Sequence, residues 1–218
     1  MRTKFDQELK DLHDELIAMA SLVETAISRA VEAMKYRDTK LAQQTMAGDR
    51  DIDQKERAIE SSCLKLLLQQ QPVACDLREI STALKMITDM ERIGDLAEDI
   101  AEVTLFLCEH PAYAVPPQVA YMAEATIKMV RDAIDAFIAK DLAQAHSVIE
   151  YDDIVDQLFM ETRQELIETI HQSTENAERA MDCMMIAKYF ERIGDHAVNI
   201  SEWVEFSITG THKQTRVL

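Results

Sequence analysis

Apolar residues recur at intervals of three and four through most of the chain, a pattern that predicts amphipathic helices rather than strands. The pattern is interrupted by short turn-like segments such as Arg37-Asp38-Thr39, Gln71-Pro72 and Lys140-Asp141. Only 4 glycines and 4 prolines occur in the 218 residues, so we expect long helices with short connections. The predicted fold class is all-α, with six helices over about residues 5–36, 40–70, 76–109, 118–139, 142–171 and 175–209.

A proline-rich segment divides this pattern near its middle. Pro111, Pro116 and Pro117 fall within seven residues, and such a segment cannot continue a helix. We therefore predict a first domain over residues 1–110, a linker over residues 111–117 and a second domain over residues 118–218. Each domain is long enough for three helices joined by short turns, which favours antiparallel neighbours. The expected architecture is two tandem, similar three-helix bundles.

The two halves repeat each other in sequence. Residues 91–95 read ERIGD, and residues 191–195 read ERIGD again, 100 positions later. The apolar stripe around the motif also recurs at this offset: Met86, Met90, Ile93, Ala97, Ile100, Thr104 and Leu107 correspond to Ile186, Phe190, Ile193, Ala197, Ile200, Val204 and Ser207. This part of the repeat indicates that each half buries an equivalent helix face.

Acidic residues lie beside that stripe in pairs four positions apart, which places both members of a pair on one helix face. Antiparallel packing could bring the pair on the third helix of each half against a pair on the second helix. Four converging carboxylates would favour hard cations such as Mg²⁺, Mn²⁺, Ca²⁺ or ferric iron. Gly94 and Gly194 also sit in mid-helix at this level, which suggests a closely approaching neighbour. The candidate metal ligands are Asp49, Asp53, Glu91 and Asp95 in the first half, and Asp152, Asp156, Glu191 and Asp195 in the second.

Two other interpretations of these acids stay open. Acids four residues apart are common on solvated helix faces, so the chain could be a helical scaffold without metal. A carboxylate-bridged metalloenzyme, either a hydrolase or an oxygen-activating protein, is the other alternative. It is the weaker one, because the di-iron type needs two ExxH motifs and Glu168-Thr169-Ile170-His171 has no equivalent in the first half.

Composition limits the remaining function classes. The chain has 40 acidic and 23 basic residues and a formal charge of −17, which argues against nucleic-acid binding. Its four cysteines show no zinc-ligand spacing, and we expect them among apolar neighbours in a reducing compartment. The first residues lack a signal-peptide pattern, and no apolar run approaches the length of a membrane span. We therefore expect a soluble, intracellular protein without membrane insertion.

Three sequence features together resemble the PhoU family of bacterial phosphate-signalling regulators. They are the double ERIGD, the segment Gln71-Pro72-Val73-Ala74-Cys75-Asp76-Leu77-Arg78, and the opening pattern Phe5…Glu8-Leu9…Leu12. The resemblance extends from about residue 5 to residue 210. It implies a non-enzymatic, usually dimeric protein whose (E/D)xxxD motifs hold multinuclear clusters of iron, zinc, magnesium or manganese. The eight carboxylates named above match those motifs, and Arg78 matches an Asp-Leu-Arg element of uncertain role.

The function implied by this resemblance is negative regulation of phosphate uptake and of phosphate-starvation signalling. The protein would link the ATPase subunit of the phosphate-specific ABC transporter to a membrane sensor histidine kinase. Its expected location is the cytoplasm, at the inner face of the membrane when it is held there by these partners. The second half departs from the family pattern, because it lacks the Gln-Pro segment and has Asn199 where the first half has Asp99. We therefore expect the two sites to differ in their surroundings.

Overall fold

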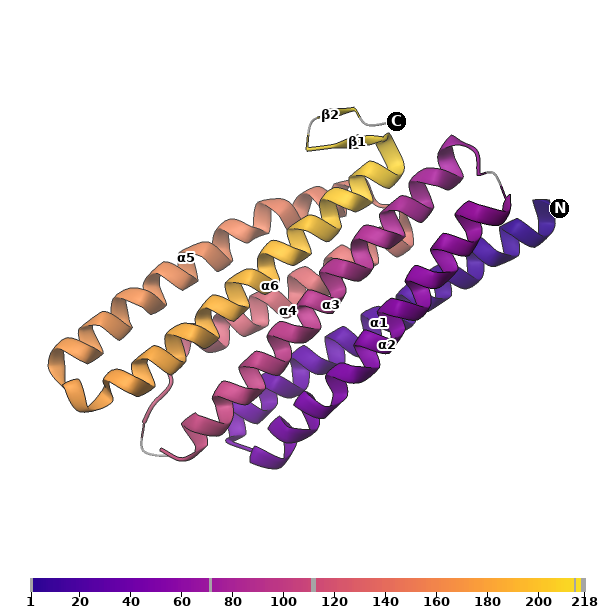
Figure 1. The fold of residues 1–218 in the computed structure, drawn as a ribbon. Coiled ribbons are helices and arrows are strands. Elements are labelled where there is room, and N and C mark those ends of the chain that lie inside the picture. The colour runs from indigo at the N-terminus through magenta and orange to yellow at the C-terminus, as the bar shows by residue number, and fades with distance from the viewer. Residues whose placement is uncertain (1, 71, 111–112, 214, 217–218) are drawn as a thin grey trace.

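The computed structural model describes residues 2–70, 72–110, 113–213 and 215–216. Six long helices make up most of this part of the chain (Figure 1). They are α1 (Arg2–Tyr36), α2 (Thr39–Gln70), α3 (Ala74–Cys108), α4 (Pro117–Ala139), α5 (Leu142–Gln172) and α6 (Ala177–Thr209). A 3₁₀ turn, η1 (Thr174–Asn176), precedes α6, and a short antiparallel hairpin of β1 (Thr211–His212) and β2 (Thr215–Arg216) follows it.

The all-α class and the six helices are confirmed, and the predicted boundaries differ from the observed ones by three residues or fewer. α4 begins at Pro117, which the sequence analysis assigned to the linker. Proline is accepted at the first position of a helix because its missing N–H has no partner there. Residues 111–112 of the predicted linker lie outside the described residues. The C-terminal hairpin was not predicted, since strands of two residues leave no alternating pattern.

Local side-chain and backbone features end and begin the helices. The Asp38 carboxylate accepts the backbone N–H groups of Lys40 and Leu41, both at 3.0 Å, and so caps the start of α2. Asp141 caps α5 in the same way by accepting the N–H of Gln144 at 3.1 Å. The residues before these caps, Arg37 and Lys140, adopt left-handed backbone angles with φ of 54° and 52°. The two halves therefore connect their first and second helices through equivalent turns.

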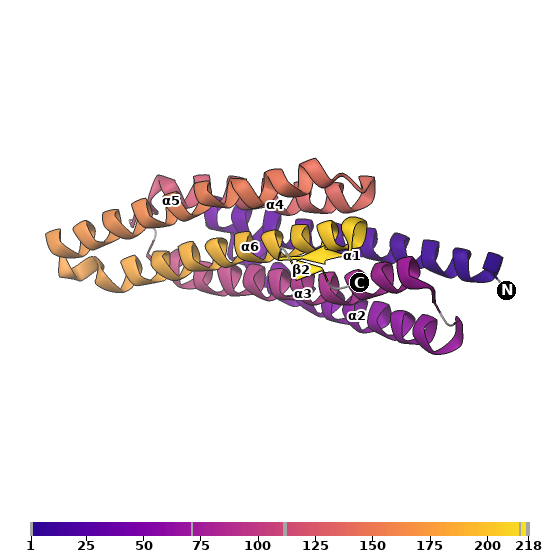
Figure 2. The same ribbon diagram turned by 90° about the horizontal axis from the view of Figure 1, so that it is seen from above.

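The helices form one elongated body in which the two halves pack against each other (Figures 1 and 2). α3 and α6 run antiparallel at its centre, and α1 of the first half also contacts α4 of the second. α2 packs on α1 and α3, whereas α5 packs on α4 and α6, so these two helices lie on the outside. A single cluster of buried apolar side chains joins the two halves.

The apolar stripe predicted for α3 and α6 forms the centre of this core. In α3 all seven stripe residues are buried, and in α6 six of the seven are. Ser207 is the exception, because it is half-buried where the first half has the buried Leu107. The prediction that the stripe serves packing is therefore confirmed, apart from this position near the end of α6.

Cys75 is exposed, so the expectation of apolar surroundings for the cysteines is wrong at this position. It lies in the first turn of α3, which faces solvent, whereas Cys63 and Cys183 are buried as expected. Over the described residues, no helix is both long enough and apolar enough to cross a membrane.

Candidate metal sites

In the first half, α2 and α3 bring three predicted ligands together. Asp49, Asp53 and Asp95 each place one carboxylate oxygen within 4.8 Å of the other two. Glu91 joins this group from one turn earlier in α3, and its pKa is raised by burial first and then by the charge of Asp95. The four carboxylates predicted from sequence to share a site in the first half therefore do converge.

The two mid-helix glycines explain how the helices come this close. A methyl group at Gly94 would lie 3.2 Å from Oδ1 of Asp49 and 2.9 Å from Cδ1 of Ile52, both on α2. At Gly194 it would lie 3.0 Å from Oδ1 of Asp152 on α5. The expectation of a close neighbour at both glycines is confirmed, and in each half the neighbouring atoms include Oδ1 of the first aspartate of the DxxxD pair.

The environment of Asp49 fits a bound cation. Its Oδ1 atom is buried and has no hydrogen-bond partner in the described part of the chain. Burial raises the pKa of this carboxyl group, followed by the charges of Asp95 and Asp53. A buried anionic oxygen beside two other carboxylates is unfavourable unless a proton or a cation is shared with it. The donors are all carboxylate oxygens, which suit hard divalent or trivalent metal ions.

Basic side chains neutralise only the outer edge of this group. Arg92 contacts Asp95 at 2.7 Å and Glu91 at 3.4 Å, and Arg57 contacts Asp53 at 3.0 Å. Their side chains are 54% and 71% exposed, so solvent screens both ion pairs. Asp49, the carboxylate that faces the glycine, has no ion-pair partner among the residues that the structure describes.

The second half gathers its four carboxylates more loosely. Burial raises the pKa of Asp152 to about 6, with further contributions from Asp156, Asp195 and Glu191. Asp156 and Asp195 are exposed, however, whereas their counterparts in the first half are half-buried. Within the described residues, only the first-half group brings three possible ligand atoms within 4.8 Å of one another. The four residues predicted for the second site are neighbours, but they do not form an equally tight cluster.

Two further acids of the first half belong to this region. Glu56 lies one turn after Asp53, and its charge contributes to the raised pKa of Glu91. Glu98 lies one turn after Asp95 on α3, and Asp49 makes the largest charge contribution to its raised pKa after burial. The sequence analysis missed Glu56, although its spacing of three from Asp53 places both on one face of α2.

The second half has different neighbours at the corresponding positions. The 103-residue offset of the DxxxD pairs places Phe159 where Glu56 stands. The ammonium group of Lys188 lies 5.5 Å from the ring centre of Phe159 and contacts Glu191 at 2.5 Å. At this position the first group therefore has an additional carboxylate, whereas the second has an aromatic ring with a lysine beside it.

Asn199 has a role that the sequence did not reveal. Its side-chain amide donates a hydrogen bond of 3.2 Å to Asp89 on α3, and Nδ1 of His196 lies 2.9 Å from the same oxygen. These contacts cross between the two halves. An aspartate at position 199 would repel Asp89, which gives a physical reason for the departure from the repeat.

Other residues considered from sequence lie apart from these groups. His171 and Glu168, the isolated ExxH pair, are both exposed near the end of α5. Arg78 is half-buried in α3, and its Nε atom is buried without a hydrogen-bond partner among the residues described.

A model of the PhoU domain matches the sequence twice, over residues 16–104 and over residues 119–204. The chain belongs to the PhoU family. The two matches contain both groups of carboxylates, so the duplicated sites fall within duplicated PhoU domains. The family suggested by the double ERIGD and the Gln-Pro segment is thereby confirmed.

Similar proteins extend over nearly the whole chain. A "phosphate-specific transport system accessory protein PhoU homolog" of Pseudomonas putida is 38% identical over 95% of this chain and 82% of its own length. One of the same name from Aquifex aeolicus is 38% identical over 87% of this chain and 86% of its own. The crystal structure of PhoU from Pseudomonas aeruginosa is 37% identical, with a TM-score of 0.91 over 95% of this chain and all of that chain. The six-helix PhoU architecture is therefore shared.

Proposed function

We propose that this protein is a non-enzymatic accessory regulator of a phosphate-specific transport system. It reduces phosphate uptake and represses the phosphate-starvation response when phosphate is plentiful. The observation that carries the proposal is the near full-length match to PhoU relatives whose names describe transport-system accessory proteins. The match includes both halves and both carboxylate groups, so it is not limited to one shared helix pair.

The proposed regulator acts in the cytoplasm, as a homodimer, by binding two membrane-associated partners. These are the ATPase subunit of the phosphate-specific ABC transporter and a sensor histidine kinase. Binding both would join the state of the transporter to the activity of the kinase, and would hold the regulator at the inner face of the membrane.

The proposal includes multinuclear metal sites, with iron, zinc, magnesium or manganese as the candidate ions. The supporting observation is the buried, unpartnered oxygen of Asp49 within the first-half group. Bound cations would supply positive charge that offsets the repulsion between α2 and α3, and between α5 and α6. The proposed ligands are Asp49, Asp53, Glu91, Asp95, Asp152, Asp156, Glu191 and Asp195, and Glu56 and Glu98 lie nearby in the first half.

Gene replacement in the source organism tests the regulatory role. Deletion of the gene should raise both phosphate uptake and starvation-induced phosphatase activity in phosphate-rich medium. A chain carrying Asp49→Asn and Asp95→Asn should show the same defect if the metal is required. The matched control is Asp51→Asn with Asp135→Asn, which removes the same charge from two exposed positions.

The outcomes separate the parts of the proposal. Unchanged uptake and unchanged phosphatase activity after deletion would refute the regulatory role. A folded double variant that has lost metal and still represses normally would show that regulation does not need the metal. Turnover of phosphate esters or oxygen by the purified, metal-loaded protein would favour the metalloenzyme alternative instead.

A further inference from the structure

Lys188 places a positive charge against the second group of carboxylates. Its ammonium group donates a hydrogen bond of 2.5 Å to Oε2 of Glu191, a proposed metal ligand, and lies 5.5 Å from the ring centre of Phe159 on α5. The side chain of Glu191 is only 15% exposed, so solvent screens this contact less than it screens a surface ion pair. Burial raises the pKa of Asp195, and Glu191 raises it further, whereas Lys188 acts in the opposite direction. The lysine therefore offsets part of the negative charge that would attract a metal ion.

The internal repeat shows that the fold does not require this lysine. At the offset of 100 residues, the counterpart of Lys188 is Thr88. Thr88 is exposed, and its hydroxyl donates a hydrogen bond of 3.3 Å to the carbonyl oxygen of Leu84 on the same helix. The first half thus packs α2 on α3 with a neutral side chain where the second half packs α5 on α6 with a cation.

The charge beside the α3 and α6 glutamates is reversed between the halves. Burial raises the pKa of Glu91, and the negative charge of Glu56 on α2 contributes to this increase. The offset of 103 residues replaces Glu56 with Phe159, and the ammonium group of Lys188 lies between this ring and Glu191. A carboxylate is therefore the neighbour of the first glutamate, and an ammonium group is the neighbour of the second.

Two arginines contact the first group, but they do not remove this difference. The side chains of Arg57 and Arg92 are 71% and 54% exposed, so solvent screens their charges. Glu56 and Glu98 add two further carboxylates to the first group, and neither is repeated in the second half. The first group keeps an excess of negative charge, whereas the second combines fewer carboxylates with a lysine.

We propose that Lys188 is a built-in counter-ion of the second-half metal site and competes with a divalent cation for Glu191, so that this site binds the ion more weakly than the first-half site does. The ammonium group has to leave Glu191 or remain beside the bound ion, and either lowers the affinity. Both sites hold metal when it is plentiful, and the second site releases its metal first when it becomes scarce. This inference rests on the metal sites of the proposed function and makes the second half the part that responds to metal supply.

Calorimetric titration of metal-free protein with Mn²⁺ tests the inference, because Mn²⁺ favours carboxylate ligands. Glu91→Gln with Asp95→Asn leaves only the second site. Glu191→Gln with Asp195→Asn leaves only the first. We expect the protein with only the second site to bind its first Mn²⁺ ion more weakly. Adding Lys188→Thr to that protein should tighten binding by about three- to tenfold, the order expected for one unit charge near a divalent ion in a partly solvated site.

The reciprocal change transfers the lysine to the first half. Thr88→Lys, made in the protein that retains only the first site, should weaken Mn²⁺ binding by about three- to tenfold. Lys188→Gln removes the charge and keeps a long side chain, so it should tighten the second site as Lys188→Thr does. It also tests the charge if the threonine variant does not fold, as judged by circular dichroism.

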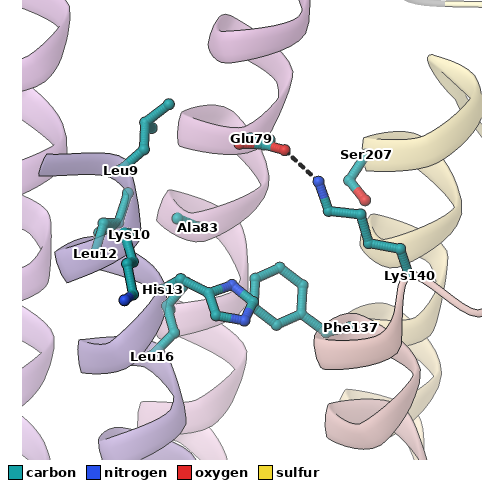
Figure 3. Close-up of a pocket in the computed structure, with 10 residues that line it drawn as sticks. All are labelled: Leu9, Lys10, Leu12, His13, Leu16, Glu79, Ala83, Phe137, Lys140 and Ser207. Atoms are coloured by element: carbon teal, nitrogen blue, oxygen red, sulfur yellow. Dashed lines mark hydrogen bonds and ion pairs between the residues drawn. The ribbon is translucent and has the colours of Figure 1, made fainter. Parts of the chain in front are cut away.

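Lys10→Thr is the matched control, because it removes the same charge from an exposed position far from both groups. Lys10 lines a pocket of about 220 Å³ near one end of the bundle (Figure 3). Glu79 and Ser207 of this pocket each lie 12 residues from the nearest proposed ligand on the same helix, a rise of roughly 18 Å. This separation exceeds the screening length of about 10 Å, so Lys10→Thr should leave both Mn²⁺ affinities unchanged.

The outcomes distinguish this inference from the proposed function. Equal Mn²⁺ affinities of the two isolated sites would overturn the inference, as would unchanged binding by the folded Lys188→Thr or Lys188→Gln variant. In either case the metal sites themselves would stand. The absence of Mn²⁺ binding by the wild type would instead refute the metal sites, and the role of Lys188 with them.

Discussion

Gly94 and Gly48 both lie inside helices, but the space beside them differs. A methyl group at Gly48 would have no atom within 4 Å, whereas one at Gly94 would lie 2.9 Å from Cδ1 of Ile52 and 3.2 Å from Oδ1 of Asp49. Alanine is favoured over glycine in a helix by about 1 kcal/mol. Gly48→Ala should therefore stabilise the protein by about that amount.

At Gly94 the same gain in helix propensity is offset by the cost of fitting a methyl group into the packed core. Ile52 is only 2% exposed, so its side chain cannot turn into solvent and must shift within the core. Forcing an extra methyl group into a packed core costs about 1–3 kcal/mol. Gly94→Ala should therefore destabilise the protein by between zero and about 2 kcal/mol. It should be about 1–3 kcal/mol less stable than Gly48→Ala.

Thermal unfolding followed by circular dichroism, in the presence of a chelator, measures this difference without a metal contribution. For a chain of this length each kcal/mol corresponds to about 2–4 °C. A difference of about 2 kcal/mol should therefore place Gly94→Ala about 4–8 °C below Gly48→Ala. Equal melting temperatures for the two variants would refute the close approach of α2 to α3 at the level of the carboxylates.

Three further predictions concern other parts of the molecule. The folded pKa of Asp152, about 6, exceeds its ordinary value of 3.8, so the folded state binds a proton more tightly than the unfolded state. The free energy of unfolding of metal-free protein should then fall by about 1 kcal/mol as the pH rises from about 4 to about 6. Asp152→Asn should remove this pH dependence, as measured by urea unfolding at several pH values. Asn199→Asp places a second carboxylate beside Asp89 and should cost about 1–2 kcal/mol in the same assay, a loss that Asp89→Asn should partly reverse. Arg37→Ala removes hydrogen bonds to two linker-side carbonyls and should cost about 2 kcal/mol, whereas Arg29→Ala, at an exposed position, should be neutral.

Features set by local periodicity were predictable from the sequence. The stripe that includes Ile93 and Ile193 identified the buried face of α3 and α6, because helical burial follows residue spacing directly. Asp38 and Asp141 marked the turns, since each caps the helix that follows it. The convergence of the α2 and α3 carboxylates in the first half followed from antiparallel packing of neighbouring helices.

Features set by contacts between the halves were not predictable in this way. Nothing in the spacing of Asp89 and His196 indicates that α3 and α6 place them 2.9 Å apart, because they are more than 100 residues apart in sequence. The binding of Arg37 to the linker-side carbonyls likewise depends on the path of the chain after α3. The first-half group is tighter because its carboxylates are less exposed: Asp95 is half-buried, whereas Asp195 is exposed. This difference cannot be read from the motif, which is identical in the two halves.

Metal content tests the central proposal most directly. Protein purified without added chelator should contain iron, zinc, magnesium or manganese at stoichiometric levels in elemental analysis. Glu91→Gln with Asp95→Asn, which keeps the side-chain shapes, should remove the first-half share and leave metal held by Asp152, Asp156, Glu191 and Asp195. The absence of stoichiometric metal in the wild type, or the same metal content per chain in the folded double variant, would contradict the account.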